Sequence, residues 1–192
     1  AVTTGVKNTF LGGLAGDATT DADENVAIGY DSLGTNILGG ASVAVGASAL
    51  RTQNPASAVT MYNTAVGHFA GYAVTTGVQN TLIGGLAGDA NTTADNMTAV
   101  GYQALTTYNR TDGANSNNTA VGAGAFLALT TGNANTAVGS EAGANQQGAA
   151  NCTFLGYRAG KDSTGESNTF VGGLCGDATD DGAENVAVGM SA

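Results

Sequence analysis

A short string that ends in glycine recurs at nearly constant spacing along the whole chain, and this repeat constrains the fold more than any other feature. The repeat glycines are Gly12, Gly29, Gly46, Gly67, Gly84, Gly101, Gly122, Gly139, Gly156, Gly172 and Gly189. Most successive repeat glycines lie 17 residues apart, and the steps into Gly67 and Gly122 are 21 residues. Self-similarity at a fixed period is the signature of a repeat architecture, so we predict a single repeat domain over residues 1–192.

The residues around each repeat glycine form columns of constant chemistry. The residue before the glycine is Leu, Ile or Val in every unit, the residue three before it is Thr or Val, and the residue three after it is small. The residue four before it is Asn in eight of the eleven units. Identity at equivalent positions means that each unit meets its neighbours in the same geometry, which is typical of a solenoid.

The local pattern favours strands over helices. β-branched residues at alternate positions, followed by glycine, predict a short strand that ends in a turn. A 17-residue coil has a perimeter of roughly 56 Å, enough for two or three short strands and tight corners. We expect an all-β parallel β-solenoid of about eleven coils, with positive φ at the repeat glycines and an Asn ladder between coils.

The two faces of the predicted strand are both mostly apolar. One face carries the residues three and one before the glycine, which we name the Thr column and the aliphatic column, and we place both inside the coil. The residue two before the glycine, the middle column, then points outward, yet it contains no polar residue. We therefore predict that its large members form the interface of a homo-oligomer: Phe10, Leu82, Phe154 and Phe170.

Several of the repeated strings resemble those of a known family. The strings Asn25-Val-Ala-Ile-Gly-Tyr and Asn63-Thr-Ala-Val-Gly resemble the head repeats of YadA-like trimeric autotransporter adhesins. The string Asn96-Met-Thr-Ala-Val-Gly is similar to repeats of bacteriophage tail fibres. The resemblance implies a left-handed solenoid, three copies side by side, and an extracellular place on a cell surface or a virion tail fibre. The family's head repeats are usually shorter than 17 residues.

Composition excludes several classes of function. The chain has 15 acidic and five basic residues and a net charge of −10, which disfavours nucleic acid and anionic membranes as partners. No apolar run is long enough to span a bilayer, so we expect no membrane insertion. No serine-hydrolase, phosphate-loop, zinc-protease or Cys-x-x-Cys motif occurs, and we predict that the protein is not an enzyme.

Acidic residues gather at three corners that follow a Gly-Asp-Ala string and suggest a cation, and the middle corner holds Asp89 and Asp95. The candidate ligands lie at the other two: Asp17, Asp21 and Asp23 near the start of the chain, and Asp177, Asp180 and Asp181 near its end. Calcium takes about six to eight oxygen ligands, and glycine-rich turns supply carbonyl oxygens. None of the three corners has the EF-hand spacing, and solvated carboxylates that keep the turns soluble are the alternative. Calcium is the only cofactor that the sequence suggests.

Two four-residue insertions, near residues 51–60 and 106–115, are the candidate recognition elements. Insertions in a solenoid map to loops on one side, which often form its binding face. The candidate receptor-binding residues are Arg51, Gln53, Asn54, Tyr108, Asn109 and Arg110. The alternative is a passive bulge. Outside these loops, Cys152 and Cys175 are expected to be packed free thiols, and His68 to lie at the surface.

These features favour a non-enzymatic fibre module that presents loops to a cell-surface glycan or protein receptor. A rigid oligomer would bind through many weak sites at once. One alternative is an ice-binding solenoid that uses the Thr column, although Val26, Val43 and Val186 interrupt that column. Another is a purely structural filament. The chain begins and ends inside a coil, so we expect a segment of a longer fibre.

Overall fold

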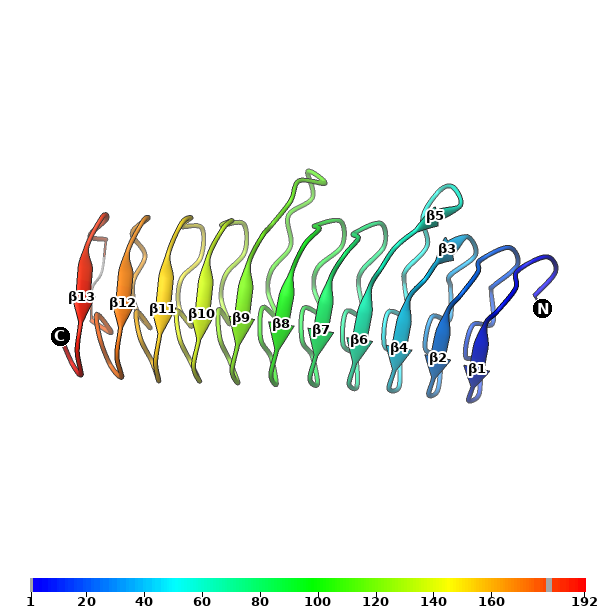
Figure 1. The fold of residues 1–192 in the computed structure, drawn as a ribbon, viewed down its shortest axis with the longest axis horizontal. Helices are drawn as coiled ribbons and strands as arrows, with labels where there is room; N and C mark the ends of the chain where they lie inside the picture. The colour runs from blue at the N-terminus through cyan, green and yellow to red at the C-terminus, as the bar shows by residue number, and fades with distance from the viewer. Residues whose placement is uncertain (1, 179–180) are drawn as a thin grey trace.

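The computed structural model describes residues 2–178 and 181–192, which form an all-β parallel β-solenoid of about ten turns. The coils stack into a rod with the two termini at opposite ends (Figure 1). The strands are β1 Thr9–Leu11, β2 Val26–Ile28, β3 Gly39–Gly40, β4 Val43–Val45, β5 Val59–Thr60, β6 Thr64–Val66, β7 Thr81–Ile83, β8 Thr98–Val100, β9 Thr119–Val121, β10 Thr136–Val138, β11 Thr153–Leu155, β12 Thr169–Val171 and β13 Val186–Val188.

Eleven of these strands form one parallel sheet, and each pairs with the same columns of the next coil. Thr64, for example, lies opposite Thr81, Ala65 opposite Leu82 and Val66 opposite Ile83. The remaining strands, β3 and β5, form a separate two-stranded sheet. Most coils therefore hold one strand of three residues and turns elsewhere, fewer strands than the two or three per coil that the perimeter suggested. The prediction of a parallel β-solenoid is confirmed.

The repeat glycines turn the chain sharply at the end of each main strand. Their φ angles lie between 128° and 142°, a region that disfavours any residue with a side chain. A Cβ placed on Gly122 would lie 2.4 Å from the carbonyl oxygen of Gly139 in the next coil. Glycine is therefore required at this corner both by its φ and by the close approach of successive coils.

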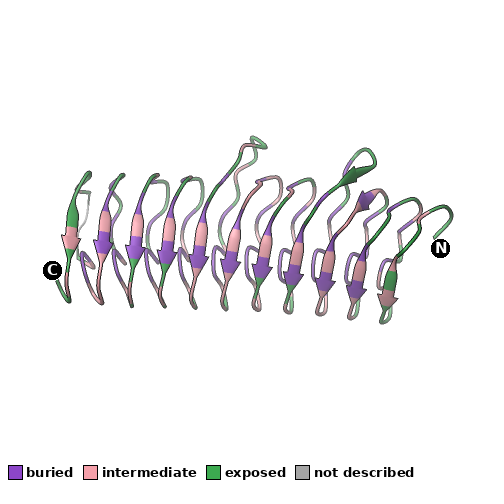
Figure 2. Cartoon of the chain, viewed as in Figure 1, coloured by how far each residue is buried: buried purple, intermediate pink, exposed green. Residues whose placement is uncertain are grey.

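The core lies on the opposite side of the strand from the one that the sequence suggested. The middle column is fully buried from β2 to β12, and Figure 2 shows buried residues in the strands of the eleven-stranded sheet between its two terminal ones. Opposite it lies the turn column, the residues four after each repeat glycine: Gly16, Leu33, Leu50, Gly71, Gly88, Leu105, Phe126, Gly143, Gly160 and Gly176. The leucines and the phenylalanine of the turn column are fully buried.

Large residues of the two core columns exclude each other within a coil. Coils with Phe or Leu in the middle column have Gly in the turn column, and coils with Leu or Phe in the turn column have Ala in the middle column. Two coils have small residues at both positions, and large side chains from the adjacent coils fill the space inside them. A Cβ on Gly143, for example, would lie 2.5 Å from Phe126 and 2.8 Å from Phe154. Large side chains of neighbouring coils thus fill the thin core.

Buried asparagines join successive coils through the backbone. The Asn80 side chain accepts a hydrogen bond from the Met97 amide at 2.9 Å and donates one to the Ala94 carbonyl at 3.0 Å. Asn25, Asn118 and Asn135 hold equivalent positions, and each is buried. The predicted ladder therefore exists, but its rungs run from side chain to the backbone of the following coil. No helix in the described residues is long and apolar enough to cross a membrane.

Candidate functional site

The Thr and aliphatic columns form a continuous face on the outside of the eleven-stranded sheet, which we name the outer sheet face. Its Thr column is Thr9, Val26, Val43, Thr64, Thr81, Thr98, Thr119, Thr136, Thr153, Thr169 and Val186, and its aliphatic column is Leu11, Ile28, Val45, Val66, Ile83, Val100, Val121, Val138, Leu155, Val171 and Val188. All of these side chains are partly or largely exposed within the chain. The face therefore presents β-branched and aliphatic groups to the surroundings.

The outer sheet face is regular because the strands are in register. Seven threonines, from Thr64 to Thr169, lie side by side in consecutive strands. Eleven strands at a spacing of about 4.8 Å give a row on the order of 50 Å long and an area of roughly 500 Å². Contiguous exposed apolar surface on a monomer often marks an interaction site.

The predicted oligomer interface through the middle column is wrong. Leu82, Phe154 and Phe170 are fully buried within their own chain, and Phe10 packs against the same core. The three fully buried side chains cannot contact a second copy, because they fill the space that the turn column leaves open, and Phe10 is half-buried. Both faces of the strand are apolar, so the alternation alone did not reveal which one turns inward. The outer sheet face, by contrast, leaves its aliphatic side chains partly or largely exposed.

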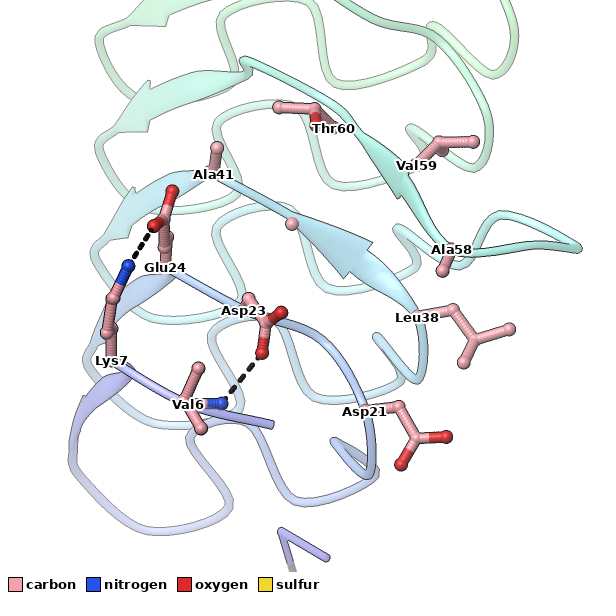
Figure 3. Close-up of a pocket in the computed structure, with 11 residues that line it drawn as sticks. Val6, Lys7, Asp21, Asp23, Glu24, Leu38, Ala41, Ala58, Val59 and Thr60 are labelled. Carbon is pink, nitrogen blue, oxygen red and sulfur yellow. Dashed lines mark hydrogen bonds and ion pairs between the residues drawn. The ribbon is translucent and has the colours of Figure 1, made fainter. Parts of the chain in front are cut away.

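The first insertion forms a loop that carries β5 and projects from one edge of the rod (Figure 1). With the first coils it encloses an open depression of about 320 Å³ (Figure 3). The acidic side chains of this depression already have donors in the chain: Asp23 accepts from the Val6 amide at 2.7 Å, and Glu24 pairs with Lys7 at 2.8 Å. The hydrogen bond from Lys7 to Glu24 raises the pKa of the lysine.

The candidate receptor residues of this first insertion differ in burial and in their bonds. Gln53 is fully buried and bonds to Ser42 and Asn63, so it belongs to the core and its assignment to a receptor site is wrong. Arg51 pairs with Asp31 and donates to the Tyr72 hydroxyl at 3.2 Å, and its pKa is raised mainly by its bond to Asp31. Asn54 is exposed.

The second insertion projects from the same edge, between β8 and β9 (Figure 1). Tyr108 is fully buried beneath it, so its assignment to a receptor site is also wrong. Asn109 is exposed and accepts a hydrogen bond from Thr92 at 2.7 Å. Arg110 pairs with Asp112, and their hydrogen bond lowers the pKa of the aspartate and raises that of the arginine. Both buried residues are seven after a repeat glycine, a column that packs inside the coil.

The structure does not assemble the calcium site expected at the first corner. Among the described residues no three His, Cys, Asp or Glu side chains come together in an arrangement that could hold a metal ion. Asp21 accepts from the hydroxyls of Thr3 and Thr4, and Asp23 from a backbone amide, so each is engaged separately along the edge. At the last corner Asp177 and Asp181 are described, whereas Asp180 lies outside the described residues.

The remaining candidate groups are structural. Cys152 and Cys175 are free and buried, as predicted, and each sulfur lies near backbone carbonyls of the core. His68 is exposed and packs edge-on against Phe69, with ring centroids 4.3 Å apart.

A groove on the surface coincides with a change in one column of the repeat, which the sequence analysis did not identify as a candidate site. An open groove of about 400 Å³ crosses four successive turns, those that follow β8, β9, β10 and β11. Tyr102, Gly124 and Glu141 are among the residues that line it. Gly124 is the only glycine among the residues two after the repeat glycines. A missing side chain in an otherwise filled column marks a place where the surface is hollowed.

No known protein family, curated protein or solved structure matches this chain.

Proposed function

We propose that this chain is a non-enzymatic module of an extracellular fibre, of the kind found in bacterial surface adhesins or phage tail fibres. It associates side by side with copies of itself through the outer sheet face and presents its insertion loops to a cell-surface glycan or protein. The observation that carries the proposal is the outer sheet face itself, a row of about 50 Å with apolar groups in every strand. The resemblance to YadA-like head repeats favours a left-handed solenoid and three copies.

The chemistry of the outer sheet face suits contact with another copy. Its aliphatic column has no charged member, and flat surfaces with repeated aliphatic groups bury apolar area when they meet. The apolar area buried between two rods grows with the number of coils that meet, because each coil contributes the same small contact. The two insertion loops project from one edge, so association through the sheet leaves them free to meet a receptor.

Sedimentation equilibrium tests this association with a matched pair of variants. Ile83 in the outer sheet face and Ile37 near the insertion edge are 38% and 37% exposed. We expect the wild-type mass to be a multiple of 18.6 kDa, Ile83→Glu to reduce it to 18.6 kDa, and Ile37→Glu to leave it unchanged. A wild-type protein that sediments as a folded monomer would overturn the proposal of side-by-side association.

Receptor binding by the loops has its own test. Shortening both 21-residue coils to the 17-residue pattern of their neighbours removes the insertions and preserves the repeat. Binding of the intact protein to whole cells should be lost in the shortened variant. Binding that survives the shortening would mean that the loops are passive bulges and that a different surface meets the receptor.

A second candidate, an ice-binding solenoid, is favoured by one observation. Seven threonines in consecutive strands lie in the outward column, where an array of hydroxyl and methyl groups at a spacing of about 4.8 Å is available to a flat solid. Because ice and a second copy would compete for the same face, the two candidates predict opposite results. A monomer with thermal hysteresis at micromolar concentration supports ice binding, and an oligomer without it supports the fibre module.

A further inference from the structure

The groove that crosses the turns after β8 to β11 exists because one side chain is missing. In every coil the residue two after the repeat glycine has a positive φ, and all but one of these residues carry a side chain. The exception is Gly124, with a φ of 66°. A Cβ placed there would meet only the Cγ of Glu141, at 3.8 Å. The space above Gly124 is therefore open, with occupied positions of the same column on both sides.

One wall of the groove is aromatic. Tyr102 is 58% exposed and lies in the turn after β8. Its ring lies over Gly85 of the preceding coil, where a Cβ would be 3.5 Å from the ring carbon Cδ2. Leu127 and Ala144 add apolar surface to the lining. An aromatic ring with a hydroxyl at its tip offers an apolar body and a polar end to a ligand.

The opposite wall is charged and held in place by ion pairs. Lys161 Nζ lies 2.7 Å from the Glu141 carboxylate, and Arg158 Nε lies 3.6 Å from it. The hydrogen bond from Lys161 is the main reason that the pKa of Glu141 lies below its ordinary value, so the carboxylate remains an acceptor at neutral pH. Two of the five basic residues of this acidic chain thus meet beside one groove. The wall offers both a donor and an acceptor for hydroxyl groups.

We propose that this groove binds a sugar residue of a cell-surface glycan, with the apolar face of the sugar ring on Tyr102 and its hydroxyls on Glu141 and Lys161. A ring with one apolar face and a rim of hydroxyls matches an aromatic wall opposite a paired donor and acceptor. The volume of about 400 Å³ falls within the range of about 300–1,000 Å³ that is usual for small-ligand sites. This inference rests on the proposed role in receptor recognition and adds a saccharide subsite that acts together with the insertion loops on the same receptor.

The variants that test the groove have matched controls within the repeat. Gly124→Gln fills the groove, and the fold accepts glutamine there because Gln103 holds the same position in the preceding coil with a φ of 58°. Tyr102→Ala removes the aromatic wall. Tyr30→Ala is the control, because Tyr30 holds the same column, is 60% exposed and lies outside the groove. Circular dichroism and thermal unfolding of each variant should match those of the wild type.

The probe is a printed array of bacterial and animal surface oligosaccharides, followed by calorimetric titration with the strongest binder. We expect Gly124→Gln and Tyr102→Ala each to weaken binding by about tenfold or more, which is at least about 1.4 kcal/mol, with Tyr30→Ala unchanged. Saccharide binding that persists in both groove variants would overturn this inference.

The remaining outcomes separate this inference from the proposed function. Glycan binding that is lost in the loop-shortened protein but kept in Gly124→Gln overturns the groove and leaves the fibre module standing. A wild-type protein that binds whole cells but no saccharide on the array also overturns the groove and assigns recognition to a protein receptor. A folded monomer that binds neither cells nor saccharides overturns both.

Discussion

Phe154 fills the space that a side chain at Gly160 would need. A Cβ on Gly160 would lie 2.5 Å from the ring of Phe154, and the same ring stacks on Phe170 of the next coil with centroids 5.5 Å apart. In the coil of β8 the arrangement is reversed, because Ala99 takes the strand position and Leu105 the turn position, both fully buried. Most coils therefore receive a large core residue from one side or the other.

This exchange predicts a compensating pair of substitutions. Phe154→Ala should lower the free energy of unfolding by about 3–5 kcal/mol, because it leaves a cavity in a fully buried position. Adding Gly160→Leu, which recreates the Ala99 and Leu105 arrangement, should restore much of the loss. Urea unfolding followed by circular dichroism measures both variants.

Gly160→Leu alone is the control for that pair. With Phe154 still present it should destabilise the protein, because the new side chain overlaps the ring. If the two substitutions together cost the sum of their separate effects, Phe154 and Gly160 do not share one space.

The stability cost of replacing a glycine by alanine should depend strongly on the position of that glycine in the coil. Gly122→Ala should lower the free energy of unfolding by about 2–3 kcal/mol or more, because it forces a side chain into a positive φ and against the Gly139 carbonyl. Gly173→Ala is the matched control, since a Cβ there has nothing within 4 Å. Thermal unfolding should separate the two variants, and equal effects would contradict the close approach of successive coils.

The asparagine ladder predicts a cost for losing one rung. Asn80→Ala removes an acceptor for the Met97 amide and a donor for the Ala94 carbonyl, both in a buried environment. We expect the free energy of unfolding to fall by about 1–3 kcal/mol, because the buried Met97 amide loses its acceptor, whereas the Ala94 carbonyl keeps the hydrogen bond that Asn91 donates to it. Gln79→Ala next to it changes an exposed side chain and should cost little. A similar loss in both would assign the effect to the backbone rather than to the ladder.

Burial of Tyr108 predicts a loss of stability at high pH. Burial raises the pKa of its phenol above the ordinary value of 10.0, while Ser116 and Arg110 nearby act in the opposite direction. A raised pKa in the folded state stabilises the fold fully below pH of about 10, and this contribution is lost as the pH rises through the folded value. The free energy of unfolding should therefore fall more steeply above pH of about 10 in the wild type than in Tyr108→Phe.

Tyr157→Phe, at an exposed position, controls for the general effect of removing a tyrosine hydroxyl. It should keep the wild-type slope in the alkaline range. Equal slopes for wild type and Tyr108→Phe would mean that Tyr108 ionises in the folded chain as readily as in the unfolded one.

The candidate site was only partly visible in the sequence. The spacing of the repeat glycines reveals the insertions, yet Gln53 and Tyr108 within them are core residues, since the column seven after the glycine packs inward. The groove at Gly124 had a signal, a single glycine in a column of side chains. Its meaning required the positions of Tyr102 and Glu141 on adjacent turns, which a column of letters does not contain.

The sequence by itself determined the period, the equivalence of the columns, the corner glycines and the parallel stacking, because identical units must meet in identical geometry. Only the tertiary structure decided which face of the strand is the inside. Strand side chains alternate with a period of two, and a shift by one residue exchanges the faces. Where one face holds Ala and Phe and the other Thr and Val, hydrophobicity does not distinguish them. The large residues of the turn column determine that the middle column points inward. Leu33, Leu50, Leu105 and Phe126 need space that only alanines across the coil leave open.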